Sequence, residues 1–251
     1  MFSILETIVK EHERKVEICY SPALFPVYYT NKDCVVVVID IFRATSAICT
    51  AFQHGVKRII PVSSVDEAKE YQSQGYIAAA ERHGEIVEGF DIGNSPFSYM
   101  NPSLKGKEVV LTTTNGTKAI ERAKAADHVI VGSFLNIDAV CRYLERKNKN
   151  VILLCAGWRD RYNMEDSLFA GAVVHRLKKN PIFKGLADSS LAADHLYELA
   201  KGNLNDFLKN TSHRNRLARL NLEEDISYCL QENTMDLVPV YKGNALVIEN
   251  E

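Results

Sequence analysis

The fold class of this chain is best predicted from one apolar segment, Val35-Val36-Val37-Val38-Ile39-Asp40. An unbroken run of β-branched residues favours a strand buried on both faces, as in a parallel α/β sheet. Comparable apolar runs predict further strands at residues 16–19, 58–62, 76–80, 108–112, 128–131 and 151–156. Helix-like segments lie between or after them, at residues 45–54, 65–74, 117–126, 137–147 and 163–178. The alternation predicts a three-layer α/β/α fold with mostly parallel strands.

The chain also resembles itself at an offset of 72 residues. Residues 37–71 and 109–143 share identical pairs such as Val37/Val109, Thr45/Thr117 and Tyr71/Tyr143. The repeat is compatible with two related βαβ modules packed together. We therefore divide the chain into a module at 1–100, which has a strand-end Asp/Arg loop, and a module at 101–251. The second module has a Thr-rich loop, a helix with a Glu-Asp pair, a helical C-terminal tail and two short last strands.

Composition indicates a small partner molecule. The chain has 251 residues, 46% hydrophobic content and a net charge of −2, so it has no overall positive field for nucleic acid or anionic lipid. The apolar patch within residues 1–15 is too short for a signal sequence or a membrane span. We expect a cytoplasmic protein with no membrane or nucleic-acid partner, and a homodimer is compatible with this pattern.

The loop after the first long strand carries the most chemistry. Asp40 ends the strand, and Arg43, Thr45 and Ser46 follow at the start of a helix. A carboxylate at a strand end can hold Mg²⁺ or attack phosphorus, while an arginine and a helix N-terminus can bind phosphoryl oxygens. The structural alternative is that Asp40 caps the helix and Arg43 neutralises it.

A second polar loop follows the strand at 108–112. It contains Thr113, Thr114, Asn115, Gly116 and Thr117, directly before a predicted helix. Hydroxyl groups and backbone N–H groups that converge without a carboxylate suit an anion better than a metal. A Thr-rich turn that only caps the helix is the structural alternative.

Four further residues are candidates for binding. Arg82 follows the strand at 76–80, where a cation has little structural use unless it meets an anion. Asn94 lies in the motif at 89–96 and could bind the substrate or only bond to the backbone. Glu165 and Asp166 lie in the first turn of the helix at 163–178, where acids complement the helix dipole and could also join Asp40 around a hard cation.

The cysteines offer one alternative mechanism. None of the six forms a C-x-x-C pair, which argues against zinc and disulfides and predicts buried thiols. Cys155 and Arg161 have the C-x5-R spacing of cysteine-based phosphatases, in which a thiolate attacks phosphorus. Trp158 and Asp160 within this loop oppose a tight phosphate cradle.

Taken together, the ordered motifs VIDIFRAT, AERHGE, GFDIGNSP, TTTNGTKAI, GSFLN, CAGW and the Glu-Asp pair resemble the 2-phosphosulfolactate phosphatase family. The resemblance covers about residues 35–171. It implies a Mg²⁺-dependent phosphatase that converts (2R)-2-phospho-3-sulfolactate to 3-sulfolactate and phosphate, a step of coenzyme M biosynthesis. Modest departures occur at Phe42, Ser46, Ala80 and His83.

On this basis we predict a role for each of these residues. Asp40, Glu165 and Asp166 hold Mg²⁺, and Arg43 with the 113–117 loop holds the phosphoryl group. Arg82 binds the carboxylate or sulfonate end. The predicted catalytic residues are Asp40, Arg43, Arg82, Asn115 and Thr117, and the predicted substrate-binding residues are Arg43, Thr45, Ser46, Arg82, Asn94, Thr113, Thr114, Asn115, Gly116 and Thr117.

The nucleophile stays open between water bound to the metal and Asp40 itself. Covalent aspartyl phosphatases often carry a D-x-D pair, and Phe42 stands at the second position here, which favours water. Two other functions also remain open: a phosphatase for another small anionic phosphomonoester, and a phospho-ligand-binding protein without turnover.

Overall fold

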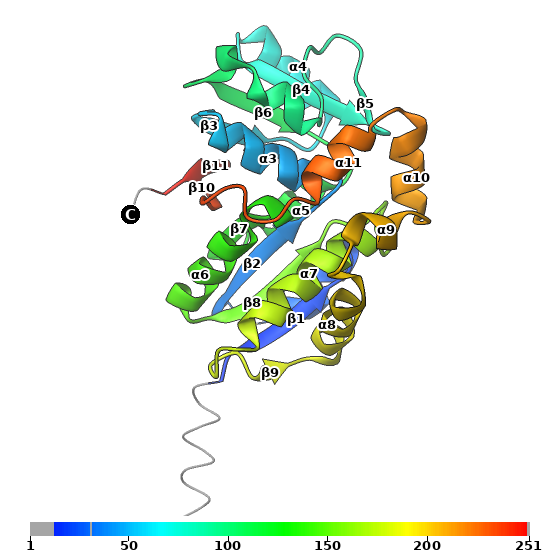
Figure 1. Cartoon of the computed structure of the whole chain (residues 1–251). Coiled ribbons are helices and arrows are strands. Elements are labelled where there is room, and N and C mark those ends of the chain that lie inside the picture. Colours follow the sequence, from blue (N-terminus) through cyan, green and yellow to red (C-terminus); the bar gives the residue numbers. More distant parts are fainter. Residues whose placement is uncertain (1–12, 31, 250–251) are drawn as a thin grey trace, which may run out of the picture.

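One sheet of eleven strands runs through the computed structural model, which describes residues 13–30 and 32–249 (Figure 1). The strands are β1 (Lys15–Cys19), β2 (Cys34–Ile39), β3 (Arg58–Pro61), β4 (Ile77–Arg82), β5 (Glu85–Ile86), β6 (Glu108–Thr112), β7 (His128–Gly132), β8 (Asn150–Cys155), β9 (Gly185–Leu186), β10 (Pro239–Lys242) and β11 (Ala245–Ile248). The helices are α2 (Phe25–Tyr28), α3 (Ala44–Gln53), α4 (Val65–Ser73), α5 (Gly116–Ala123), α6 (Ile137–Lys147), α7 (Met164–Leu177), α8 (Asp188–Ala200), α9 (Leu204–Leu208), α10 (Ser212–Arg219) and α11 (Glu223–Cys229).

The sheet has two parallel parts joined by an antiparallel hairpin. Its order is β5-β4-β6-β3-β11-β10-β7-β2-β8-β1-β9. Strands β4, β6 and β3 are mutually parallel, and so are β7, β2, β8, β1 and β9. The last two strands of the chain, β10 and β11, lie between the two parts and pair antiparallel with each other and with their neighbours. The predicted, mostly parallel α/β sheet is confirmed.

The two repeated segments contain the same elements in the same order. One reads β2-α3-β3-α4-β4 and the other β6-α5-β7-α6-β8. In the sheet, the equivalent strands lie at equivalent distances from the central hairpin, with β3 and β7 beside it, then β6 and β2, then β4 and β8. Each part of the sheet therefore contains strands from both segments. Strands from the two sides of the predicted boundary at residues 100 and 101 interleave in the sheet. The sheet order therefore does not mark this boundary, which stays a prediction.

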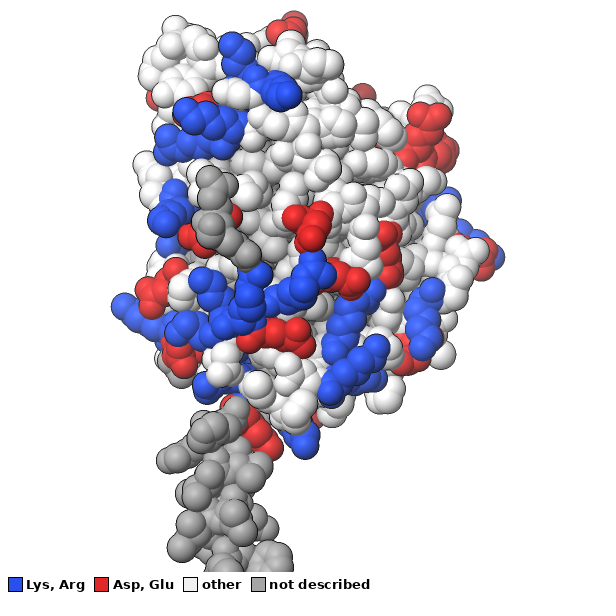
Figure 2. Space-filling view, turned by 60° about the vertical axis from the view of Figure 1, so that its left-hand side comes forward, with Lys and Arg blue, Asp and Glu red and all other residues white. Residues whose placement is uncertain are grey.

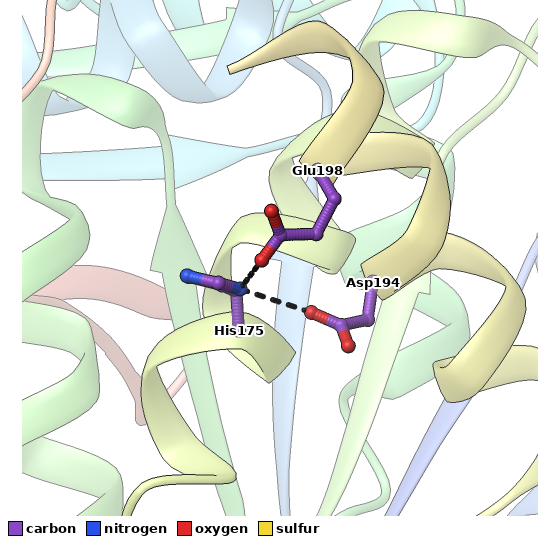
Figure 3. A group of neighbouring side chains, drawn as sticks. All are labelled: His175, Asp194 and Glu198. Atoms are coloured by element: carbon purple, nitrogen blue, oxygen red, sulfur yellow. Dashed lines mark hydrogen bonds and ion pairs between the residues drawn. The ribbon is translucent and has the colours of Figure 1, made fainter.

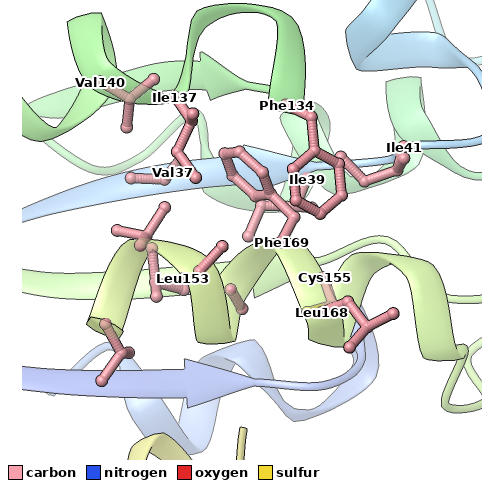
Figure 4. Close-up of a cluster of buried hydrophobic side chains, with 14 of the residues drawn as sticks. Val37, Ile39, Ile41, Phe134, Ile137, Val140, Leu153, Cys155, Leu168 and Phe169 are labelled. Atoms are coloured by element: carbon pink, nitrogen blue, oxygen red, sulfur yellow. The ribbon is translucent and has the colours of Figure 1, made fainter. Parts of the chain in front are cut away.

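Helices cover both faces of the sheet. Alternate residues of β2 face opposite sides: Val37 and Ile39 join the core formed with Phe134 and Phe169, which Figure 4 shows, whereas Val36 and Val38 join the core formed with α3 and α5. The α3–α5 core also receives residues of β3 and β6, so both parts of the sheet contact the same pair of helices. Helix α4 covers the other face of β3 and β6. This is the predicted three-layer arrangement.

Local signals placed the elements well. Strand β6 and helix α6 have the predicted bounds, and the Ser64 side chain caps α4 by accepting from the backbone N–H of Glu67. Helix α5 ends at Ala123, three residues earlier than predicted. No helix among residues 13–30 and 32–249 is long and apolar enough to cross a membrane. The N-terminal patch considered above falls mainly on residues 1–12, outside the described residues.

Candidate active site

Asp40 lies at the carboxyl end of β2, on the wall of a small cavity of about 10 Å³. Its backbone N–H donates to Thr45 Oγ1 over 3.1 Å, and its carboxylate accepts from the backbone N–H of Ala44, the first residue of α3. The capping alternative is therefore part of the observed geometry. The cavity is lined by Asp40, Phe42, Arg43, Glu81, Gly84, Asn94, Asn115, Trp158, His213 and Leu217.

Glu165 and Asp166 approach Asp40 from the first turn of α7, and both are fully buried. Asp166 braces the loops: its Oδ1 accepts from Ile41 N over 2.9 Å, and its Oδ2 accepts from Gly157 N over 3.1 Å and from Asn163 Nδ2 over 2.9 Å. Glu165 Oε1 accepts from Asn163 Nδ2 over 3.0 Å. The predicted Asp40, Glu165 and Asp166 therefore belong to one region, although Asp166 already uses both oxygens.

Burial and the charges of neighbouring acids both raise the pKa of Asp40 and the pKa of Asp166. Burial raises the pKa of Asp40 to about 7, and Glu81 and Glu165 add to the shift while His213 opposes it. The pKa of Asp166 is raised well above its usual range by burial and by the charges of Asp40 and Glu165. Acidic groups held together away from water create a strong preference for a positive charge among them.

Several polar atoms in this region have no partner inside the protein. Among the described residues, five buried side-chain N or O atoms lack a hydrogen bond, and four of them belong here: Asn94 Oδ1, Asn163 Oδ1, Glu165 Oε2 and Arg216 Nη2. The first three are acceptors and the fourth is a donor. Because an unpaired buried polar atom is costly, the region is suited to a bound cation and a bound anion.

Arg43 crosses from the Asp40 loop to the C-terminal helices. Its Nη1 pairs with Asp225 of α11, and its Nη2 donates to Gly84 O over 2.7 Å. Asp225 also accepts from Ser95 Oγ over 3.1 Å. Arg43 thus lines the cavity, and its carboxylate partner is Asp225 rather than Asp40.

Glu81, not Arg82, faces the cavity from β4. Successive residues of a strand point to opposite faces, and Arg82 donates from Nη1 to Glu81 O over 2.6 Å and from Nη2 to Thr112 Oγ1 over 3.0 Å. Glu81 Oε1 accepts from Gly84 N over 2.5 Å, and its Oε2 accepts from Thr114 N over 3.2 Å. Sequence reasoning missed Glu81, although it precedes Arg82 directly in the motif.

The Thr-rich loop reaches the cavity through Asn115. Asn115 lines it, and its Oδ1 accepts from Arg159 N over 3.1 Å. The hydroxyls of Thr113 and Thr117 bond instead to each other's backbone, and Ser46 Oγ donates to Ile41 O over 3.0 Å. These hydroxyls shape the helix N-termini, as the structural alternative for this loop describes.

The basic helix α10 covers the cavity, which sequence reasoning did not foresee. His213 lines it, and its Nδ1 donates to Glu165 Oε1 over 2.5 Å. The His213 ring also lies 5.5 Å from the ring of Trp158, another lining residue. Helix α10 lies far from Asp40 in the sequence. The only sequence signal that could have pointed to it is the run of basic residues at 212–219.

Cys155 is the last residue of β8 and lies in the core beside Leu168 and Phe169 (Figure 4). Burial, followed by the charge of Asp166, raises the pKa of its thiol well above the usual value. Since the thiolate is the nucleophilic form, this environment opposes the cysteine mechanism. All six cysteines are buried and free, as predicted.

A second acidic cluster lies between α7 and α8. His175, Asp194 and Glu198 point toward one another in Figure 3, and within the described part of the chain only this group has three His, Cys or carboxylate ligand atoms within 4.8 Å of one another. Asp40, Glu165 and Asp166 are thus not such a group as they stand. Lys178 Nζ lies 2.7 Å from Asp194 Oδ2, so the cluster at α7 and α8 already contains its cation.

A broader hollow lies beside α6, away from Asp40 and its neighbouring carboxylates. It is lined by Arg142, Arg146 and Lys147 together with Asp236 and Glu249. Figure 2 shows Lys and Arg side chains gathered on one face of the molecule with acidic side chains among them. Because Arg142 pairs with Asp236, the surface here has mixed charge.

Buried carboxylates and an arginine at a strand end of an α/β sheet are the arrangement found in α/β enzymes that act on small anionic substrates. The chain belongs to the 2-phosphosulfolactate phosphatase family, whose sequence model matches residues 19–244. It is 42% identical over 212 residues to a protein of Caldanaerobacter subterraneus named probable 2-phosphosulfolactate phosphatase, covering 83% of this chain and 88% of that protein. A protein of Thermotoga maritima with the same name is 39% identical over 213 residues, covering 85% and 91%. The resemblance found in the sequence is confirmed, and membership supports a phosphoric monoester hydrolase.

Proposed function

We propose that this protein hydrolyses (2R)-2-phospho-3-sulfolactate to 3-sulfolactate and phosphate and that it requires Mg²⁺. The relatives named for this reaction support the substrate. The observation that carries the Mg²⁺ requirement is the set of buried carboxylates around Asp40, whose pKa is raised to about 7 by burial and by neighbouring acids.

The residues present fit a hard divalent cation. Asp40 and Glu165 supply carboxylate oxygens, and the unpartnered Glu165 Oε2 and Asn163 Oδ1 are further oxygen donors of the kind Mg²⁺ prefers. Asp166 acts in this proposal as a brace, because each of its oxygens already accepts at least one hydrogen bond. When bound, Mg²⁺ neutralises charge on the phosphoryl oxygens.

The remaining residues bind and orient the substrate. Arg43 offers a guanidinium that Asp225 and Gly84 O hold in place, so little side-chain entropy is lost when a phosphoryl group binds. The N-terminus of α3 begins directly after Arg43 and offers a favourable dipole to the same anion. His213 and Trp158 restrict access of water from the α10 side.

The test is phosphate release from phosphosulfolactate, phospholactate, phosphoglycolate and an aryl phosphate, each with Mg²⁺ and with EDTA. The proposal expects the highest kcat/KM for phosphosulfolactate and no release in EDTA. A higher kcat/KM for one of the other phosphorylated acids would support a phosphatase with a different substrate. Tight binding without release from any of these compounds would instead support the phospho-ligand-binding alternative.

A further inference from the structure

Arg216 lies on the face of α10 that covers the cavity. It is three residues after His213 and one before Leu217, and these two side chains line the cavity. Residues three and four apart occupy the same side of a helix, so Arg216 is directed toward the site. The helix is held there in part by the hydrogen bond between His213 Nδ1 and Glu165 Oε1.

The guanidinium of Arg216 is held flat but has an unused donor. Its Cζ lies 3.5 Å from the centre of the Trp158 ring, a stacked cation–π contact. Its Nη2 is buried and has no hydrogen-bond partner. A charged donor buried in this way costs free energy unless an acceptor arrives.

The nearby acids do not serve as that acceptor. Glu165 and Glu81 are close enough to raise the pKa of Arg216, although burial lowers it more. Glu165 Oε1 is bonded to His213 and Asn163, and Glu165 Oε2 makes no hydrogen bond to Arg216 or to any other group. Glu81 is bonded to Gly84 N and Thr114. Arg216 therefore stands beside the site as a positioned cation with one buried donor unused.

We propose that Arg216, stacked on Trp158, binds the second acidic group of the substrate, a carboxylate or sulfonate on the carbon chain that bears the phosphate. This rests on the proposed function and specifies its substrate class. A planar guanidinium fork matches such oxyanions, and the Trp158 ring fixes its plane. Arg82 is a weaker choice, since it follows Glu81 on β4 and therefore points away from the face on which Glu81 lines the cavity.

The test compares Arg216→Gln with Arg219→Gln, an exposed arginine one turn further along the same helix. We expect Arg216→Gln to lower kcat/KM for phosphosulfolactate by roughly 10- to 150-fold, the range for one lost hydrogen bond to a charged group, mainly through KM. Activity on an aryl phosphate, which has no distal acid, should stay within about threefold of wild type. Arg219→Gln should match wild type on both substrates, and Arg82→Gln should show no such selectivity.

The binding of 3-sulfolactate, measured by calorimetry, tests the role of Arg216 separately from the proposed function. Wild type should bind it, Arg216→Gln should bind it at least about tenfold more weakly, and inorganic phosphate should bind both proteins alike. Equal losses on both substrates, or unchanged sulfolactate binding in Arg216→Gln, would overturn the role of Arg216. If wild type binds sulfolactate in an Arg216-dependent way but does not release phosphate, the proposed reaction is overturned. The anion-binding role of Arg216 would then still hold.

Discussion

Ala44 and Gly116 face each other from equivalent positions of the two repeated segments. They are the first residues of α3 and α5 and lie 72 positions apart, the offset of the repeat. A Cβ atom on Gly116 would lie 2.4 Å from Ala44 Cβ and 2.9 Å from Asp40 Oδ2. The two equivalent strand-end loops therefore meet at Asp40, and a glycine makes the meeting possible.

Gly116→Ala should damage the site more than the fold. The added methyl group must displace either α5 or the Asp40 carboxylate, so we expect a large loss of kcat and destabilisation of about 1–3 kcal/mol. Gly202→Ala is the matched control, because a Cβ there would meet nothing within 4 Å. Turnover and urea denaturation of both variants check this. Wild-type turnover in Gly116→Ala would show that the close approach has no catalytic importance.

Asp40→Asn should inactivate the enzyme without unfolding it. Asn retains the shape and can still accept a hydrogen bond from Ala44 N, so the capping role survives. A neutral amide is a poor Mg²⁺ ligand and is not a nucleophile. Turnover at saturating Mg²⁺ is to be measured beside a thermal melt of the same preparation. A folded variant that retains most of its turnover would remove Asp40 from the mechanism.

Activity should depend on metal and not on a thiol. We expect EDTA to abolish phosphate release, Mg²⁺ to restore it, and a thiol alkylator to leave the native enzyme active, since every cysteine is buried. The assay is phosphate release before and after each treatment. Full activity in EDTA together with inactivation by the alkylator would favour Cys155 instead.

The metal-free protein should lose stability as pH rises toward neutrality. Asp40 has a folded pKa of about 7 against an ordinary value of 3.8, so the folded state retains a proton that the unfolded chain releases. The associated stability is fully present below about pH 4 and is lost as pH rises through about 7. Asp40→Asn should flatten this part of the profile. Free energies of unfolding in EDTA, taken from about pH 5 to about pH 8, check this.

Added Mg²⁺ should reverse that loss. Because the cation favours ionised carboxylates, its stabilising effect on wild type should be larger at about pH 8 than at about pH 5. Asp40→Asn should show a smaller Mg²⁺ effect at both values. Parallel pH profiles for wild type and Asp40→Asn, with equal responses to Mg²⁺, would contradict both expectations.

The helices and strands, the strand-end position of Asp40, the Thr-rich loop and the family could all be predicted from the sequence, because hydrophobic periodicity, turn residues and motifs are local signals. Whether Glu81 or Arg82 faces the cavity could not be predicted in this way. The two residues are adjacent on a strand, and a shift of one residue in strand register exchanges the side chains that point toward the cavity with those that point away. The tertiary structure also decided the long-range partners, which join Arg43 to Asp225 and Glu165 to His213 across 182 and 48 positions. Such contacts depend on how the C-terminal helices pack over the sheet, and no local pattern in the chain encodes that packing.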